Sequence, residues 1–362
     1  MINVYFYSLI LTVPLTYLIE KIKFNSIKNR NIISIILFFY TLIILVAISG
    51  FRDTATISIF NSRQSDEFNY RNSFNMLIGS QFDFSNVKSY EWLRYLIDWT
   101  LTNVSENSQI WVFTYALFTN FFILYTIYKY SKPRWLGLFL YLSCGLFIFQ
   151  MNGTTSVMAA SILMLGIKYA LERKTFKYLV IASIASGVHF SAWVSVLVYF
   201  FAAFSLSKVR TFILVTVSLI VIFYFNEISN ILLPNSPYDY YLNQINSDDK
   251  YGVGFFRVSF FLMIYSMIIL FSRKNKITLQ NTHYFMNNIY VLIFINIVSV
   301  SYVYIYRFNE LFIISAIILI PQTLYSLEQN KKIFFTSLII ILFIVFSSIQ
   351  TKSILYENIL FK

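Results

Sequence analysis

The chain has 362 residues, of which 58% are hydrophobic and only 12% charged, and its mean hydropathy is +0.66. A soluble domain carries about 25% charged residues, so this chain cannot cover its surface with polar groups and its solvent must be lipid. The single cysteine, Cys144, excludes a disulfide within the chain and a thiolate metal cluster. With few Gly and Pro for linkers, residues 1–362 are expected to form one all-α, polytopic integral membrane domain.

Apolar runs near the length of a membrane-crossing helix recur along the whole chain, and such a helix needs about 20 apolar residues. The candidate spans are Ile2–Ile19, Ile32–Ser49, Ile110–Tyr128, Trp135–Gln150, Thr155–Leu171, Thr211–Phe225, Phe255–Phe271, Tyr284–Ile305, Leu311–Leu327 and Ile333–Ile349. Together with the apolar segment 178–204 they predict a helix bundle with about 10–12 transmembrane segments.

The segment 178–204 is long for a single crossing and has "SGVHFSAW" in its middle. Short basic connections lie between other spans, and they read "KIKFNSIKNR", "KYSKPR", "ERKTFK", "SKVR", "SRKNK" and "EQNKK". All of them fall on one side only if 178–204 enters and returns as a short helical hairpin that turns near Gly187–Ser191. The positive-inside rule then predicts cytoplasmic basic turns, with both termini outside.

This topology gives the outer face a main loop at 50–109, a second loop at 226–254 and a short turn around Gln150–Thr154. The net charge of +12 therefore lies mainly on the cytoplasmic rim. Orientation in the membrane and attraction to anionic lipid explain that surplus better than nucleic-acid binding does. We expect membrane lipid, and no nucleic acid, among the partners.

The main outer loop contains two candidate amphipathic helices. In "SDEFNYRNSFN", Asp66, Tyr70 and Phe74 recur every four residues, Glu67 and Arg71 are also four apart, and Ser65 is a candidate N-cap. In "YEWLRYLIDWTL", one face is polar and the other carries Trp and Leu, so that this helix can lie in the membrane interface. The polar face consists of Glu91, Arg94, Tyr95 and Asp98. Periodicity alone does not distinguish functional helices from ordinary interfacial ones.

His189 lies inside an apolar run at the turn of the proposed hairpin, next to Ser191. Ionisable groups at membrane depth are costly and are functional candidates by default. The alternative is a histidine whose ring is satisfied by a backbone carbonyl at a helix break. Both readings place the imidazole at the outer side of the bundle.

Further polar residues are assigned to the same side, namely Arg257, Arg307, Glu310 and Asn152. Arg307 could snorkel to solvent or hold an anion in a cavity. Arginine forks suit phosphate oxygens, and a histidine or carboxylate suits removal of a proton from a hydroxyl near neutral pH. The sequence has no Gly-rich phosphate loop, no Cys/His metal motif and no G-x-S-x-G elbow, which argues against ATP-driven work and serine-hydrolase chemistry.

From Ser49 to about Pro321 the chain resembles the EpsG/Wzy-type bacterial polysaccharide polymerases. The resemblance rests on Gly50-Phe51-Arg52, Asp66 with Tyr70, Glu91 in "YEWLRYLIDW", His189 and Ser191 in "ASGVHFSAW", and Arg307 in "YRFNELFIISAIILIPQ". The spacing from Arg52 to Asp66 is longer than in the family, so Asp53 is an alternative counterpart. Where the family has an Arg-Gln pair, this chain has Thr155 and Ser156, and Arg257 or Arg63 would have to replace that arginine.

The resemblance implies a GT-C-like polymerase that joins undecaprenyl-diphosphate-linked oligosaccharide repeat units at the outer face of the bacterial cytoplasmic membrane. The glycosyl transfer would need no metal and no cofactor, and the product would be an O-antigen, a capsule or an exopolysaccharide. A chain-length-regulating co-polymerase and a flippase are implied partners. The implied site residues are His189, Asp66 and Glu91 for catalysis, Arg52, Arg307 and Arg257 for the diphosphate, and Tyr70, Arg94, Asn152, Ser191 and Glu310 for the glycan or acceptor.

Three other classes of function are alternatives. A flippase or exporter of lipid-linked glycans would want charges along a path through the bilayer, whereas these charges crowd one end. A membrane O-acyltransferase would need catalytic residues near the cytoplasmic face or a channel for the acyl donor, and neither is evident. A structural subunit of a glycan-assembly complex would tolerate the loss of His189 and Arg52.

Overall fold

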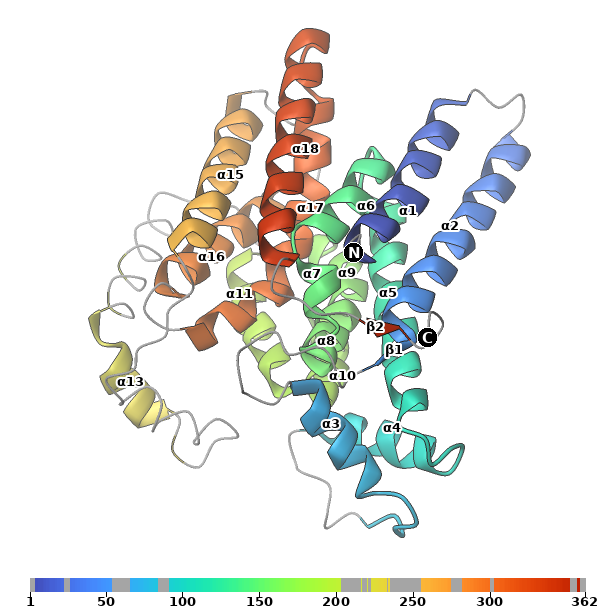
Figure 1. Cartoon of the computed structure of the whole chain (residues 1–362). Coiled ribbons are helices and arrows are strands. Elements are labelled where there is room, and N and C mark those ends of the chain that lie inside the picture. Colours follow the sequence, from blue (N-terminus) through green and yellow to red (C-terminus); the bar gives the residue numbers. More distant parts are fainter. Residues whose placement is uncertain are drawn as a thin grey trace.

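The computed structural model describes residues 4–22, 27–53, 66–83, 91–202, 216, 220, 223–232, 234, 255–274, 282–299, 303–351 and 357–358. These residues form a bundle of helices with one two-stranded pairing (Figure 1). The N-terminal elements are α1 (Val4–Lys21), α2 (Ile27–Gly50), β1 (Arg52–Asp53), α3 (Asp66–Asn75), α4 (Trp92–Thr102), α5 (Gln109–Tyr130), α6 (Arg134–Ser143), α7 (Leu146–Phe149), α8 (Thr154–Leu165) and α9 (Ile167–Leu171). The C-terminal elements are α10 (Thr175–Val188), η3 (Phe190–Trp193), α11 (Val194–Ala202), α13 (Phe225–Leu232), α15 (Phe255–Lys274), α16 (Thr282–Ser299), η5 (Val303–Phe308), α17 (Asn309–Tyr325), α18 (Gln329–Thr351) and β2 (Glu357–Asn358).

The all-α, polytopic membrane fold predicted from composition is confirmed. Within the described residues, four helices are long and apolar enough to cross a membrane, and five shorter apolar helices accompany them. The long ones are Asn29–Gly50, Gln109–Tyr130, Ile305–Tyr325 and Gln329–Ile349. The predicted span Thr211–Phe225 lies mostly outside the described residues. The total of about 10–12 segments, like the single-domain organisation, stays a prediction.

Two of the predicted spans are broken helices rather than continuous ones. The candidate span Trp135–Gln150 is divided into α6 and α7 at Gly145, whose φ of +93° is a left-handed conformation that glycine adopts without steric cost. The candidate span Thr155–Leu171 is divided into α8 and α9 at Gly166. An apolar run does not record where the backbone bends, so these two breaks within the predicted spans are not apparent in the sequence.

The helical hairpin predicted at 178–204 is confirmed. α10 ends at His189, whose backbone is extended (φ −152°, ψ 124°), and η3 and α11 follow. The hydroxyl groups of Thr175 and Tyr199 lie 2.9 Å apart, and the rings of Tyr178 and Tyr199 stack with centroids 4.4 Å apart. In one continuous helix, residues 175 and 199 would be about 36 Å apart. The chain therefore returns after His189.

Several basic turns gather at one end of the bundle. The Glu20 carboxylate in the last turn of α1 accepts a hydrogen bond from the backbone N–H of Arg134 at 3.0 Å, and the Arg134 side chain donates to Ser34 Oγ at 2.7 Å. At the same end, the Gln322 side chain of α17 donates to the backbone oxygen of Tyr130 at 2.7 Å. The C-terminal ends of α1, α5 and α17 therefore lie together, as the positive-inside rule predicts for the basic turns that follow them.

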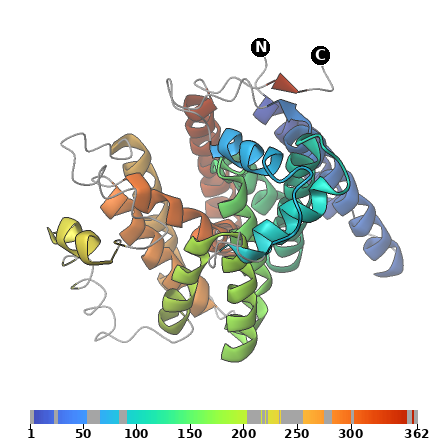
Figure 2. The same cartoon turned by 90° about the horizontal axis from the view of Figure 1, so that it is seen from below.

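The helices α3 and α4 of the predicted outer loop lie at the opposite end (bottom of Figure 1), and Figure 2 looks onto this end. Both helices were predicted from their spacing, and both are present. The helix α17 lies at the centre of the bundle. In the apolar 18-residue stretch that includes most of α17, 83% of the residues are buried, whereas only 22% are buried in the corresponding stretch of α18. The N-terminus of α17 therefore lies at the end of the bundle that α3 and α4 cover, near its middle.

Candidate functional site

A buried arginine, Arg52, ties the elements at this end together. Its Nε lies 2.8 Å from Glu67 Oε2, and both side chains are only 1% exposed. Its Nη1 donates to the backbone oxygen of Ser49, and its Nη2 donates to Thr154 Oγ1 at 3.2 Å. All three nitrogens of the guanidinium therefore bind protein, and they join the end of α2 to α3 and α8.

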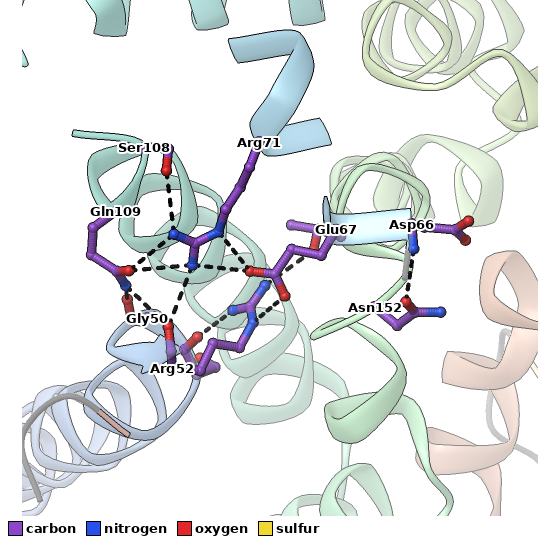
Figure 3. Close-up of polar contacts among 10 residues, drawn as sticks. Gly50, Arg52, Asp66, Glu67, Arg71, Ser108, Gln109 and Asn152 are labelled. Atoms are coloured by element: carbon purple, nitrogen blue, oxygen red, sulfur yellow. Dashed lines mark hydrogen bonds and ion pairs between the residues drawn. The ribbon is translucent and has the colours of Figure 1, made fainter. Parts of the chain in front are cut away.

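A second arginine, Arg71, completes this polar cluster (Figure 3). Its guanidinium contacts Glu67 Oε1 at 3.2 Å and Gln109 Oε1 at 3.2 Å. The Gln109 side chain in turn donates to the backbone oxygen of Gly50 at 2.6 Å. Because breaking a buried ion pair leaves an uncompensated charge, these contacts fix where α3 begins relative to α2 and α5.

The neighbouring residue, Asp66, points the other way. Figure 3 shows its carboxylate directed away from the Arg52 cluster, while its backbone N–H donates to Asn152 Oδ1 at 3.1 Å. The carboxylate lies 3.1 Å from Arg307 Nη2, at the end of η5. The Arg307 side chain is 41% exposed and that of Asp66 is 27% exposed, so this ion pair is open to solvent and ligands.

Unsatisfied polar atoms lie close to Arg307. The Glu310 carboxylate accepts a hydrogen bond from Ser156 Oγ at 2.7 Å through Oε2, whereas its buried Oε1 has no partner among the described residues. The Arg257 guanidinium lies over the Tyr306 ring, 4.2 Å from its centroid, and its buried Nε also has no partner within the described part of the chain. Within the described residues, Glu310 Oε1 and Arg257 Nε therefore have hydrogen-bonding capacity that a ligand could use.

The second polar group centres on His189 and Glu91. His189 Nδ1 lies 3.2 Å from Glu91 Oε1, and each side chain is 14% exposed. Arg94 pairs with the other oxygen of Glu91. Burial opposes ionisation of Glu91, but its hydrogen bond with His189 and the charge of Arg94 together lower the pKa of Glu91. The carboxylate is therefore ionised and holds the imidazole in a defined orientation.

Tyr70 lies between the Asp66–Arg307 pair and the Glu91–His189 pair. The Arg94 guanidinium lies over its ring, 4.7 Å from the centroid. Burial raises the pKa of Tyr70 to about 12, and the charges of Arg94, Asp66 and Glu91 all act on it, with Thr155 beside its hydroxyl. The phenol therefore stays neutral and marks where the side that carries Asp66 and Arg307 meets the side that carries Glu91 and His189.

Most of the site residues predicted from the sequence gather in these groups. The residues brought together are Asp66, Tyr70, Glu91, Arg94, Asn152, His189, Arg257, Arg307 and Glu310. Ser191 lies buried in η3, two residues after His189. Arg52 lies in the adjoining buried cluster. The alternative residue Asp53 lies in β1 opposite Glu357, and Arg63 is outside the described residues. The roles of all these residues stay predictions.

Several residues that build this end of the bundle were not predicted from the sequence. Glu67 and Arg71 were noted only as a pair four residues apart, and that spacing was the signal available for them. Gln109 and Thr154 carry no local signal, because their roles arise where distant helices meet. Asp98 was placed on a polar surface of its helix, but it is buried: its side chain faces Trp111 and Tyr115 of α5.

A metal ion has no evident binding site in the described part of the chain, where no group of three or more His, Cys, Asp or Glu side chains lies close enough to hold one. Metal-independent chemistry nevertheless stays a prediction. The described polar groups are arginines, carboxylates and one imidazole, which suit anion binding and proton transfer.

Comparison with protein families gives one match. The model of the EpsG family matches residues 54–360 of the chain, which includes both polar groups except Arg52 and its neighbours at the end of α2. No curated protein and no solved structure matches the chain.

Proposed function

The chain belongs to the EpsG family, and on that premise we propose that it joins undecaprenyl-diphosphate-linked oligosaccharide repeat units by glycosyl transfer. The family indicates a polysaccharide polymerase-type function in a multi-pass membrane protein. One observation supports the specific reaction. An exposed arginine–carboxylate pair, Arg307 with Asp66, and a histidine–carboxylate pair, His189 with Glu91, lie at the same end of the bundle on either side of Tyr70.

In this proposal the diphosphate of the donor binds on the Arg307 side. Arg307 exchanges its contact with Asp66 for the phosphate oxygens, which a planar guanidinium binds bidentately. Arg257 supplies its Nε donor nearby, which has no partner among the described residues. As the bond between the anomeric carbon and the diphosphate breaks, negative charge grows on the leaving oxygen, and positioned donors stabilise that charge.

The acceptor hydroxyl is placed on the His189 side. Its oxygen forms the new bond to the anomeric carbon of the donor, its proton passes to His189, and undecaprenyl diphosphate leaves with the electron pair of the broken bond. Glu91 orients the imidazole and stabilises the imidazolium that forms. Asp66 is the alternative proton acceptor, released when Arg307 turns to the diphosphate.

The remaining predicted residues surround these two positions. Tyr70, Arg94, Asn152, Ser191 and Glu310 would contact the glycan or the acceptor. Glu310 Oε1, which has no partner in the described part of the chain, would accept a hydrogen bond from a sugar hydroxyl. Arg52 was predicted to bind the diphosphate. In the described contacts its three nitrogens are already occupied, so we propose that it acts indirectly by holding α3 and α8 in place.

The proposed location is the bacterial cytoplasmic membrane, with the site at its outer face. Basic turns gathered at the opposite end support this orientation, because such turns stay in the cytoplasm. The polymer would be an O-antigen, a capsule or an exopolysaccharide. A flippase would deliver the lipid-linked repeat units, and a chain-length-regulating co-polymerase would be a second partner.

The test uses purified protein in proteoliposomes with synthetic undecaprenyl-diphosphate repeat units and measures ladders of glycan length. Wild type is expected to form ladders. His189→Ala should lose at least about a hundredfold in rate, the usual contribution of a general base. Arg307→Ala should lose about a hundredfold as a lost charge-stabilising donor does, and Arg307→Lys should recover part of it because the charge remains but the fork does not.

The matched control is His283→Ala, since the other histidine of the chain lies near the start of α16 and away from the site. This variant should polymerise like wild type. Ladders of normal length and rate from folded His189→Ala and Arg307→Ala proteins would overturn the residue roles. A wild-type protein that binds the lipid substrate and forms no ladder would overturn the function and favour transport or scaffolding.

A further inference from the structure

Asp98 is a carboxylate buried where α4 packs on α5, and its side chain is 3% exposed. Its Oδ1 accepts hydrogen bonds from the Trp111 indole at 2.9 Å and from the Tyr115 hydroxyl at 2.8 Å. Its Oδ2 lies 3.5 Å from Arg94 Nε. The two donors to Oδ1 come from a membrane-length helix, so the carboxylate is fixed to the bundle rather than to the surface of the loop.

Asp98 is connected to His189, the proposed proton acceptor, through Arg94 and Glu91. Arg94 faces Asp98 with Nε and Glu91 with Nη1, and Glu91 contacts His189 through its other oxygen. The Arg94 guanidinium also covers the Tyr70 ring. One arginine therefore bridges an anchored carboxylate and the carboxylate that orients the imidazole.

A neutral side chain would be sufficient to pack α4 against α5, and a buried carboxylate is costly unless it is paired. Burial raises the pKa of Asp98 to about 6, even though Arg94, Tyr115 and Trp111 all favour its charged form. The negative charge of Asp98 provides Arg94 with a counter-ion whose position is fixed. A diphosphate anion binding nearby attracts every mobile arginine, and without Asp98 it would draw Arg94 away from Glu91.

We propose that Asp98 is a positioning residue of the transfer site: anchored by Trp111 and Tyr115, it keeps Arg94 on Glu91 so that Glu91 keeps the imidazole of His189 in place. This inference rests on the proposed function. The groups that face Asp98 and its partner are Trp111 and Tyr115 from α5, Tyr70 from α3, and Glu91 with His189 on the far side of Arg94.

Asp98→Asn is the direct probe, because the amide keeps an oxygen for Trp111 and Tyr115 but turns an NH₂ toward Arg94. In the ladder assay, kcat should fall about tenfold or more, the scale of a lost hydrogen-bonded charge pair. The KM for the lipid-linked donor should change less than about threefold, because Asp98 does not touch the donor. Glu106→Gln is the matched control. It removes a carboxylate from an exposed position between α4 and α5, leaves the contacts of Asp98 unchanged, and should retain near wild-type kcat.

A double-mutant cycle separates this role from a general structural one. If Asp98 acts through Arg94, Asp98→Asn should cost nothing further in an Arg94→Gln background. Losses that simply multiply would overturn the proposal. Arg94→Lys probes the same bridge from the other side, since a single ammonium does not reproduce the two-sided contact of the guanidinium. It should reproduce the loss in kcat even where Asp98→Asn fails to fold, and normal activity of Arg94→Lys would overturn the proposal.

The outcomes also distinguish this inference from the function on which it rests. Wild-type ladders together with an unimpaired, folded Asp98→Asn protein would overturn the role of Asp98 alone. A wild-type protein without ladders would overturn the proposed function, and the role of Asp98 would fall with it.

Discussion

Arg52 and Arg307 use the same side chain in two different ways. Arg52 is 1% exposed and has protein partners on all three nitrogens. Arg307 is 41% exposed and pairs with a carboxylate that is itself partly open. A side chain in the first environment holds elements together, whereas one in the second has a guanidinium that a ligand can reach.

The first effect of removing the Arg52 side chain should therefore be a lower free energy of unfolding. Arg52→Ala leaves Glu67 buried with a weaker set of partners, and breaking a buried pair in this way costs about 3–5 kcal/mol. The thermal midpoint of the detergent-solubilised protein should fall clearly, and adding Glu67→Gln should restore part of it because the unpaired charge is then gone. Arg307→Ala should leave the midpoint near that of wild type. An Arg52→Ala protein as stable as wild type would show that the cluster does not hold this end together.

Part of this difference between the two arginines could be predicted from the sequence. It singled out both arginines and the residues around them, because charges are scarce in a chain so apolar. It did not show that Glu67 rather than Asp66 pairs with Arg52, since consecutive residues of a helix point in different directions and the choice depends on where α3 docks. The polar face that carries Asp98 was predicted, but its burial against Trp111 and Tyr115 was not, for the same reason.

At the scale of elements, the position of α4 depends on close contact with α10. A Cβ placed on Gly187 would lie 2.7 Å from the Trp92 ring and 3.0 Å from Leu93 Cβ. Gly187 comes two residues before His189, and α4 begins next to Glu91. The glycine therefore lets the two helices approach until the imidazole and the carboxylate meet.

Gly187→Ala should push α4 outward and lengthen the contact between His189 and Glu91. We expect polymerisation to fall by about tenfold, since small displacements of catalytic groups cost up to a hundredfold. Trp92→Ala in the same protein removes the ring that the new methyl group meets and should recover part of the rate. Trp92→Ala alone is the control and should be nearly fully active. Normal activity of Gly187→Ala would mean that α4 does not set this geometry.

Elements differ in how well their sequence reveals them. The helices α3 and α4 follow from residues four apart, and the hairpin at 178–204 follows from the need to keep basic turns on one side. The breaks at Gly145 and Gly166 could not be predicted, because each lies within a run that stays apolar on both sides of the glycine. The burial of α17 relative to α18 could not be predicted either, because each contains an apolar stretch long enough to cross a membrane.

At the scale of the whole molecule, polar groups are separated along the bundle. Basic turns occupy one end, and the arginines, carboxylates and imidazole of the site occupy the other. The overall charge pattern predicted this division. The assembly of α3, α4, α8, η3 and α17 around one point could not be predicted, since it depends on packing between segments far apart in the chain.

The most direct measurement determines at which end the glycan is made. Cys144 is buried, so a single added cysteine can report orientation to a membrane-impermeant maleimide. Met76, 81% exposed beyond α3, marks the site end, and Lys331, 59% exposed at the start of α18, marks the basic end. Met76→Cys and Lys331→Cys proteins would be placed in proteoliposomes enriched in each orientation, with lipid-linked repeat units supplied from one side only.

The account predicts glycan ladders only where the repeat units are supplied to the side on which Met76→Cys is labelled. Arg307→Ala and His189→Ala should slow the formation of those ladders by about a hundredfold or more in the same vesicles. Ladders formed instead from the side on which Lys331→Cys is labelled would contradict it, because the substrate would then be used at the basic end of the bundle, away from Arg307 and His189.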